Sequence, residues 1–140
     1  MSLRRLTGLI LLTVLMLTGS AGAGDPIPLD TPEPKYRTYF DKVRERIKAK
    51  WVYPRQAGER NIESELVIEF HIAKDGRLEY IELRHSSGTQ ILDDAALSAV
   101  KLAQPFPSVP DELLSDGLLV ISGQFRYQIL SGGLVNQLMR

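Results

Sequence analysis

The stretch of residues 66–83, LVIEFHIAKDGRLEYIEL, decides the fold of this chain. Its first half has a period of two, and one face carries only large apolar side chains: Leu66, Ile68, Phe70 and Ile72. A period of two predicts a β-strand with one buried face. The pair Asp75–Gly76 then predicts a tight turn, because glycine readily adopts the positive φ that such a turn needs. We therefore expect an antiparallel hairpin at the centre of the protein.

The second half of this hairpin breaks the alternation. Leu78 is in phase with Tyr80, whereas Ile81 and Leu83 fall on the opposite face. One additional residue around Glu79–Tyr80, a β-bulge, would bring Leu78, Ile81 and Leu83 to the same side. We predict such a bulge, and with it a hairpin whose single apolar face must be covered by other elements.

Two segments with helical spacing flank the hairpin. Residues 36–51 carry apolar side chains at intervals of three and four: Tyr36, Phe40, Val43, Ile47 and Trp51. Residues 91–102 carry a second stripe, which is rich in alanine and suits close packing on a sheet: Leu92, Ala96, Ala99, Val100 and Ala103. Each segment predicts an amphipathic helix that a following proline ends. The basic face of the first helix is interpreted as solvated, with partial charge pairing.

Residues 118–129 alternate again and predict a third strand, with Gly123 at one inward position. The second helix spans about 18 Å, so it returns the chain to the end where the second strand began. The predicted fold class is α+β, with the order α-β-β-α-β and two helices on one face of a three-stranded antiparallel sheet. The spatial strand order is second, first, third. The outer side of the third strand is then an edge, which is either covered by the tail or kept open for a partner.

The N-terminus predicts export. Arg4–Arg5 precede a short apolar run, and Ala21–Ala23 fits a cleavage site, so residues 1–23 are interpreted as a signal peptide, with an uncleaved membrane anchor as the alternative. Residues 24–35 contain four prolines and predict a stiff linker. One domain is expected over residues 36–130, followed by a tail over residues 131–140.

Composition argues against several classes of function. The chain has no cysteine, which excludes disulfides and cysteine-based metal sites. Without Arg4 and Arg5 the 17 basic residues become 15 against 17 acidic ones, a net charge of −2 that does not favour nucleic acid as a partner. His71 and His85 stand without a nucleophile elbow or a glycine-rich phosphate loop. We expect no enzyme, no catalytic residues, no metal and no cofactor.

Several short motifs follow one another in a regular order along residues 36–129. They are Tyr53-Pro54, Lys74-Asp75-Gly76-Arg77-Leu78, Ser86-Ser87-Gly88, Leu92-Asp93-x-Ala95-Ala96 and Pro105-Phe106-Pro107. This ordered set resembles the TonB C-terminal domain family, and the preceding helix is similar to the TolA-like branch. The resemblance implies a periplasmic domain of Gram-negative bacteria that receives short peptide segments by strand addition beside the third strand.

The expected function is non-enzymatic binding of peptide segments of envelope proteins, related to TonB-dependent transport across the cell envelope. The partner would be an outer-membrane transporter or a Tol/Ton-type component. The expected location is the periplasm, or the inner membrane with a single span and the domain facing the periplasm. The alternative function is a structural or assembly subunit that pairs with another copy through the same edge, as a homodimer.

The candidate peptide-binding residues lie along the third strand and before the hairpin. Ser122, Gln124, Arg126 and Gln128 stand beside the predicted edge. Tyr53 and Pro54 are candidate peptide-binding residues only because the resemblance to the family implies them. The family's energy transducers carry a long arm between membrane and domain, whereas the linker here is very short, so the fold carries over better than the energy-transducing role.

Overall fold

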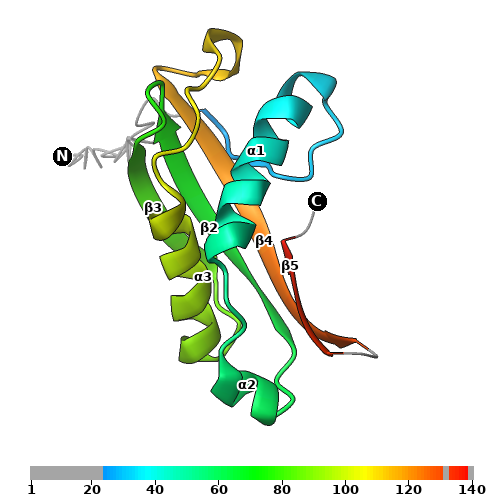
Figure 1. Ribbon diagram of the computed structural model, residues 1–140. Coiled ribbons are helices and arrows are strands. Elements are labelled where there is room, and N and C mark those ends of the chain that lie inside the picture. Colours follow the sequence, from blue (N-terminus) through cyan, green and yellow to red (C-terminus); the bar gives the residue numbers. More distant parts are fainter. Residues whose placement is uncertain (1–23, 131–132, 139–140) are drawn as a thin grey trace, which may run out of the picture.

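The computed structural model describes residues 24–130 and 133–138 (Figure 1). The predictions for the signal peptide and for the rest of the tail lie outside these residues. In chain order the elements are β1 (Ile27–Pro28), α1 (Pro34–Lys50), α2 (Arg55–Glu59), β2 (Ser64–Ala73), β3 (Leu78–His85), α3 (Gln90–Ala103), the 3-10 helix η1 (Asp111–Leu113), β4 (Leu118–Leu130) and β5 (Gly133–Leu138). In the described parts of the chain, no helix is both long and apolar enough to cross a membrane.

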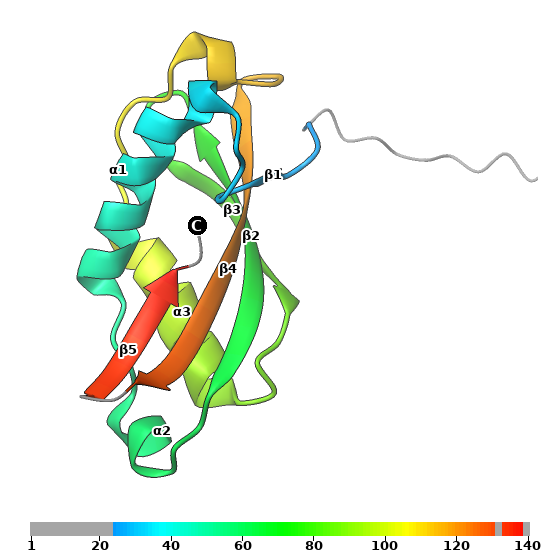
Figure 2. The same ribbon diagram turned by 90° about the vertical axis from the view of Figure 1, so that its right-hand side faces the viewer.

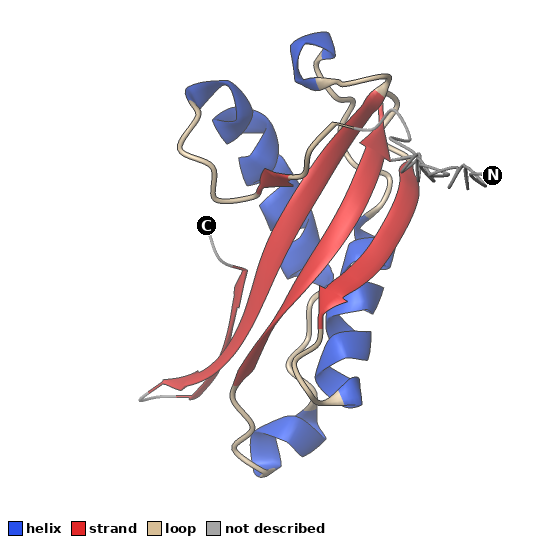
Figure 3. Cartoon of the chain, turned by 180° about the vertical axis from the view of Figure 1, so that it is seen from behind, coloured by secondary structure: helices blue, strands red, loops and turns tan. Residues whose placement is uncertain are grey.

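The molecule has two layers, a twisted sheet and a helical layer made of α1 and α3 (Figures 1 and 2). Seen from behind, the strands lie in front of the helices (Figure 3). The strand order is β1-β4-β2-β3, and β5 pairs with the same side of β4 as β1 does. The predicted α+β class and the central order β3-β2-β4 are confirmed. The prediction of only three strands and two helices is wrong, because β1, α2 and β5 are additional.

β1, α2 and the 3-10 helix η1 were not predicted because each is too short to show a periodic pattern, and the residues of β5 were assigned to the tail. β1 has two residues and α2 has five. The segment predicted as a stiff linker contains β1, and Leu29, which follows β1, is buried. The proline-rich segment is therefore partly built into the sheet. The first helix begins at Pro34, as the rule for proline in the first turn allows.

The hairpin of β2 and β3 contains the predicted bulge. Ile72 pairs with Leu78 and His71 pairs with Tyr80, so Glu79 is the extra residue on β3. A second shift of register, which was not predicted, makes Arg84 extra as well. The two bulges place Leu78, Ile81 and Leu83 opposite the buried residues of β2, as the sequence predicted.

The turn between β2 and β3 depends on a glycine. Gly76 has a φ of +90°, and a Cβ atom there would lie 1.9 Å from the carbonyl oxygen of Phe106. The amide of Phe106 also donates a hydrogen bond of 2.9 Å to the carbonyl of Gly76. Only glycine combines this conformation with so close an approach of another backbone. The turn is thus fixed by a segment 30 residues further along the chain.

The core lies between the sheet and the helices and contains the predicted apolar stripes. All five predicted residues of the first stripe and all five of the second are buried. Burying one large side chain of this kind contributes about 1.5–3 kcal/mol. Gly123 faces this core, where the rings of Phe125 and Phe70 lie 3.2 and 3.6 Å from the position that a Cβ atom would take. The inward glycine thus makes room for two aromatic rings.

Candidate peptide-binding edge

The outer side of β4 is occupied by two short strands of the same chain. β1 pairs with it in parallel at Ile121 and Ser122, and β5 pairs with it antiparallel over Phe125–Leu130. The prediction that the third strand leaves an open edge is therefore wrong for these positions. The alternative, in which the tail covers the edge, holds where β5 pairs. The N-terminal contribution of β1 was not foreseen, because two residues carry no pattern.

A short gap separates the two covering strands. The amide of Leu29 donates to the carbonyl of Ser122 at 2.9 Å, which ends the β1 ladder. In a continued parallel ladder, the amide of Gln124 would donate to the carbonyl of Leu29. That carbonyl instead accepts a hydrogen bond of 2.7 Å from Nη1 of Arg44. Within the described residues, Gln124 consequently has a strand partner on the β2 side alone.

The four polar candidates on β4 lie on the open face of the sheet and are all partly exposed. Nε2 of Gln124 and Nη2 of Arg126 each lie 3.1 Å from the same Oε2 of Glu65 on β2. Their side chains thus bind the neighbouring strand. Because the Ser122 carbonyl points toward β1, the backbone groups of every second residue point to the same edge. These residues are the four polar candidates: Ser122, Gln124, Arg126 and Gln128.

Tyr53 and Pro54 lie on the other face of the sheet, in the helical layer. The ring of Tyr53 meets the ring of Tyr127 edge to face, with centroids 5.1 Å apart, and its hydroxyl donates to the carbonyl of Ile62. Burial raises the pKa of Tyr53, and the carboxylate of Glu63 adds to the effect. Pro54 caps α2. The six predicted site residues therefore do not form one group, since β4 separates two of them from the other four.

Tyr127 links β4 to both helices that cover it. Its hydroxyl accepts a hydrogen bond of 2.7 Å from Nε1 of Trp51 and donates one of 2.9 Å to the carbonyl of Leu92 on α3. Burial raises its pKa to about 12, although the hydrogen bond from Trp51 acts in the opposite direction. This buried phenol holds β4 in place independently of the strands on its outer edge.

Glu69 lies on the open face of β2, yet its carboxylate is largely buried by two partners. Its side chain is only 10% exposed, with His71 Nε2 2.8 Å from one carboxylate oxygen and Arg84 Nε 2.8 Å from the other. Desolvation acts to raise the pKa of Glu69, but the hydrogen bonds from His71 and Arg84 outweigh it and hold the pKa below its usual value. Arg84 is 15 residues from Glu69, so the pairing depends on the register of β3 against β2, which the sequence alone does not show.

Asp93, in the first turn of α3, has a structural role. Its carboxylate accepts hydrogen bonds from the Ser86 hydroxyl at 2.5 Å and from the amide and hydroxyl of Ser87 at 2.8 and 2.7 Å. Desolvation acts to raise the pKa of Asp93, and these hydrogen bonds lower it by more. The Ser86-Ser87-Gly88 motif is thus a loop fastened to the first turn of α3.

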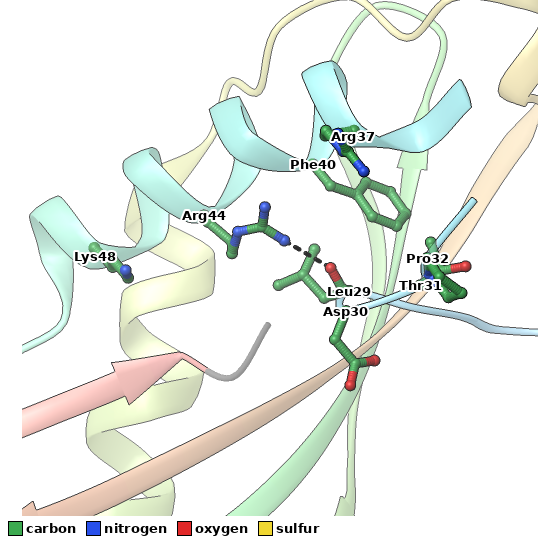
Figure 4. A pocket seen from close by; sticks show the side chains of 8 residues that line it. All are labelled: Leu29, Asp30, Thr31, Pro32, Arg37, Phe40, Arg44 and Lys48. Atoms are coloured by element: carbon green, nitrogen blue, oxygen red, sulfur yellow. Dashed lines mark hydrogen bonds between the residues drawn. The ribbon is translucent and has the colours of Figure 1, made fainter. Parts of the chain in front are cut away.

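A pocket lies where α1 passes the segment after β1 (Figure 4). Its volume is about 410 Å³, and three of its lining residues are cations from α1. The lining residues are Leu29, Asp30, Thr31, Pro32, Arg37, Phe40, Arg44 and Lys48. Figure 4 shows the end of β5 approaching the same space. The sequence interpretation of this helix face as solvated missed the pocket, because nothing in a stiff linker of residues 24–35 indicates that it packs beside α1.

Comparison with known proteins shows which proteins this domain is similar to. Residues 49–129, more than half of the chain, match the profile of the Gram-negative bacterial TonB protein C-terminal. Two curated relatives, both named Protein TonB and both from Helicobacter pylori, are 39% identical (strain J99) and 38% identical (strain 26695) over 74 residues. Each alignment covers 53% of this chain and 26% of the relative, so the chain matches about a quarter of the length of these proteins.

Two solution structures of the H. pylori TonB C-terminal domain share the fold. One aligns with a TM-score of 0.57 at 29% identity, covering 67% of this chain and 83% of the other. The second aligns with a TM-score of 0.51 at 30% identity, covering 64% and 92%. The profile match, the curated relatives and the shared arrangement of sheet and helices lead to one conclusion. The chain belongs to the TonB C-terminal domain family.

Proposed function

We propose that this protein is a non-enzymatic domain of the bacterial cell envelope, located in the periplasm, that binds an extended peptide segment of another envelope protein along β4. The role would be part of TonB-dependent transport. Membership in the family and the name of the curated relatives support the envelope role. The binding mode is supported by the architecture of the β4 edge.

The observation that carries this proposal is the way in which the β4 edge is covered. β4 has 13 residues, whereas β1 has two and β5 has six. Among the residues whose burial is described, the core side chains come mainly from β2, β4 and the helices, and the ladder that holds β5 runs to β4. A two-stranded hairpin without further packing is marginally stable in water. A peptide strand can therefore replace β5 while the domain stays folded.

Strand addition would use the backbone groups that now point to β1 and β5. These groups belong to the four polar candidates, whose amides point outward: Ser122, Gln124, Arg126 and Gln128. Main-chain hydrogen bonds then supply affinity, and alternate side chains of the peptide supply specificity. Tyr53 and Pro54 would act from the helical side, by holding the end of β4 through Tyr127.

The decisive experiment is a proline at the gap in the edge. Gln124→Pro removes an outward amide that has no strand partner in the described, unbound protein, so circular dichroism should show an unchanged fold. Binding of synthetic peptides from the N-terminal segments of outer-membrane transporters, measured by calorimetry, should weaken by about tenfold or more. Gln124→Ala is the matched control and should bind almost as the parent does. Equal binding by both variants would place the site elsewhere.

Removal of β5 tests the same mechanism from the other side. A chain that ends at Leu130 keeps every core residue whose burial the structure describes and exposes the β4 edge over Phe125–Leu130. It should bind the same peptides more tightly, because no strand has to be displaced. If instead its mass doubles with rising concentration and peptides do not compete, the edge serves pairing between two copies, which is the alternative function.

A further inference from the structure

We propose that the pocket between α1 and residues 29–32 receives an acidic side chain of the peptide that adds to β4. This inference rests on the proposed function and specifies the chemistry of the partner: an extended peptide with a glutamate or aspartate at the position that reaches the pocket. The carboxylate would lie among Arg37, Arg44 and Lys48. We call these three residues and their neighbours around the cavity the cationic pocket (Figure 4).

Two of the three cations are available to a ligand. Arg44 is held in place, because its guanidinium donates to the Leu29 carbonyl and pairs with Asp41, and only 19% of its side chain is exposed. Arg37 and Lys48 make no ion pair or hydrogen bond with any described residue, although they line a cavity of about 410 Å³. A fixed guanidinium between two free cations is an arrangement that favours a carboxylate.

The charge around the cavity remains positive after its own acids are counted. Asp41 is paired with Arg44, which leaves Arg37 and Lys48 against Asp30. Figure 4 shows the carboxylate of Asp30 directed away from Arg44, toward the side of the sheet. The apolar wall formed by Leu29 and Phe40 suits the methylene groups of an acidic side chain, which are buried while its carboxylate meets the cations.

The geometry of the edge brings a partner's side chain to this place. Leu29 provides the example, since it runs beside β4, donates to the Ser122 carbonyl and turns a buried side chain toward the helical layer and the pocket. Alternate side chains of any strand beside β4 point to that layer. A peptide that takes the place of β5 and continues past Phe125 enters the gap opposite Gln124. Its next inward side chain then reaches the cationic pocket.

The same cations do not fit a flat anionic surface as well as they fit a single side chain. Lys42 and Arg46 are exposed cations of α1 that do not line the cavity. A lipid surface held by α1 would be attracted by these two residues as much as by Arg37 and Lys48. Arg37 and Lys48 line the cavity together with the partly buried Arg44, which favours a carboxylate presented by a peptide, and lipid phosphate becomes an outcome of the test.

The experiment uses the parent chain and blocked synthetic peptides of alternating threonine and valine. Glutamate or glutamine replaces one residue at a time along the peptide. At one position, the glutamate peptide should bind about tenfold more tightly than its glutamine counterpart, and the ratio should fall toward one as salt is raised. Affinity is measured by calorimetry, with circular dichroism to verify that each variant is folded.

Two double variants test which cations of α1 cause the preference for the glutamate peptide. Arg37→Gln with Lys48→Gln should bring the ratio of the two peptides' affinities to about one, while binding of the glutamine peptide stays unchanged. Lys42→Gln with Arg46→Gln removes the same charge from the same helix outside the pocket, and should keep the tenfold ratio. A ratio that falls equally in both variants would reduce the effect to general electrostatic attraction and overturn the proposal.

The remaining outcomes separate this inference from the function on which it rests. If the peptides bind but glutamate gives no advantage at any position, strand addition stands and the cationic pocket is not its subsite. If no peptide binds, strand addition fails and this inference fails with it. Vesicles of phosphatidylglycerol form a second arm. The pocket binds lipid phosphate, and the proposal is overturned, if two results occur together. The Arg37→Gln, Lys48→Gln variant no longer binds the vesicles while the control variant still does. The ratio of the affinities for the glutamate and glutamine peptides is the same in both variants as in the parent.

Discussion

The two outer strands of the central sheet, β3 and β4, protect their free sides in different ways. β3 has eight residues, two bulges and three charged side chains: Glu79, Glu82 and Arg84. β4 has 13 residues, one charged side chain, Arg126, and an edge that pairs with β1 and β5. Bulges and charged side chains permanently prevent another strand from pairing with an edge. A short strand of the same chain instead covers an edge whose backbone stays regular.

The difference indicates which edge can receive a partner. An incoming strand needs a regular row of backbone groups, which the bulges at Glu79 and Arg84 deny on β3. On β4 the row is regular, and Gln124 already lacks a strand partner on its outer side within the described residues. β4 is therefore the edge that can pair with an added strand, and β2 lies between the two edges.

The largest effect is expected at Phe70, on the central strand β2. Its ring is fully buried, stacks on Phe106 with centroids 6.1 Å apart and lies against Gly123. Phe70→Ala should lower the free energy of unfolding by about 3–5 kcal/mol, and Ile68→Ala by about 2–5 kcal/mol, because both leave cavities. Denaturant titration measures the loss. Hydrogen exchange should accelerate in β3 and β4 alike, and acceleration in one strand only would contradict the central position of Phe70.

A smaller and more local effect on stability is expected at Leu29, the buried residue that holds β1 beside β4. Leu29→Ala removes a side chain that is 2% exposed and should cost about 2–3 kcal/mol. Hydrogen exchange should then accelerate in β4 around Ser122 and stay unchanged in β3. Glu79→Ala, at an exposed bulge of β3, is the control and should leave both strands as they are. Unchanged exchange around Ser122 in the Leu29 variant would mean that β1 does not protect the edge.

Glu69 connects β3 to the centre of the sheet in a way that depends on pH. Glu69→Gln keeps the shape but loses the charge that binds His71 and Arg84, and should cost about 1–2 kcal/mol at neutral pH. The pKa of Glu69 is lower in the folded protein than usual. Its contribution is therefore full above the ordinary carboxyl pKa and is lost as the pH falls through the lowered one.

Denaturation of the parent and the Glu69→Gln variant at a series of pH values measures this dependence. The difference in stability should shrink on acidification below about pH 4.5. Glu45→Gln, an exposed position on α1, should show no such trend. A difference that grows toward low pH would mean that the carboxylate is not stabilised by its partners.

The smallest effect on stability is expected at the gap in the β4 edge. Gln124→Ala removes one partly exposed contact with Glu65 and should change the free energy of unfolding by no more than about 0.5 kcal/mol. Thermal denaturation of the two proteins is a sufficient measurement. A loss above 1 kcal/mol would show that this position supports the fold, and the proline test of binding would then need another site.

Much of the fold follows from local patterns. Periods of two and of about four residues predicted β2, β4, α1 and α3, because a sheet or a helix on a core must bury one face. The bulge near Glu79 was predictable for the same reason, since only an extra residue returns Leu83 and Leu78 to one side. The bulge at Arg84 was not, because it follows the last inward residue of β3 and leaves no apolar side chain out of phase.

The candidate site was less predictable than the fold. The amides of Ser122, Gln124, Arg126 and Gln128 point to the predicted edge, but Tyr53 and Pro54 lie on the other face of the sheet. The burial of Glu69 also escaped prediction, because its partner Arg84 is 15 residues away. Side-chain partners across strands depend on register, and a shift of one residue reverses the faces.

The sequence by itself determined the α+β class, the central strand order, the faces of the helices and the one turn at Asp75–Gly76, because each depends on burial or on local backbone geometry. Only the tertiary structure decided what covers the β4 edge and where the cationic pocket lies. β5 covers one part of this edge, whereas the other part and the wall of the pocket depend on β1, a strand of two residues, and on the segment after it. The pairing of β1 with β4 is stabilised by Leu29 and by the bond from Arg44 to the Leu29 carbonyl, which are contacts between distant parts of the chain. No periodicity within two residues can encode such contacts.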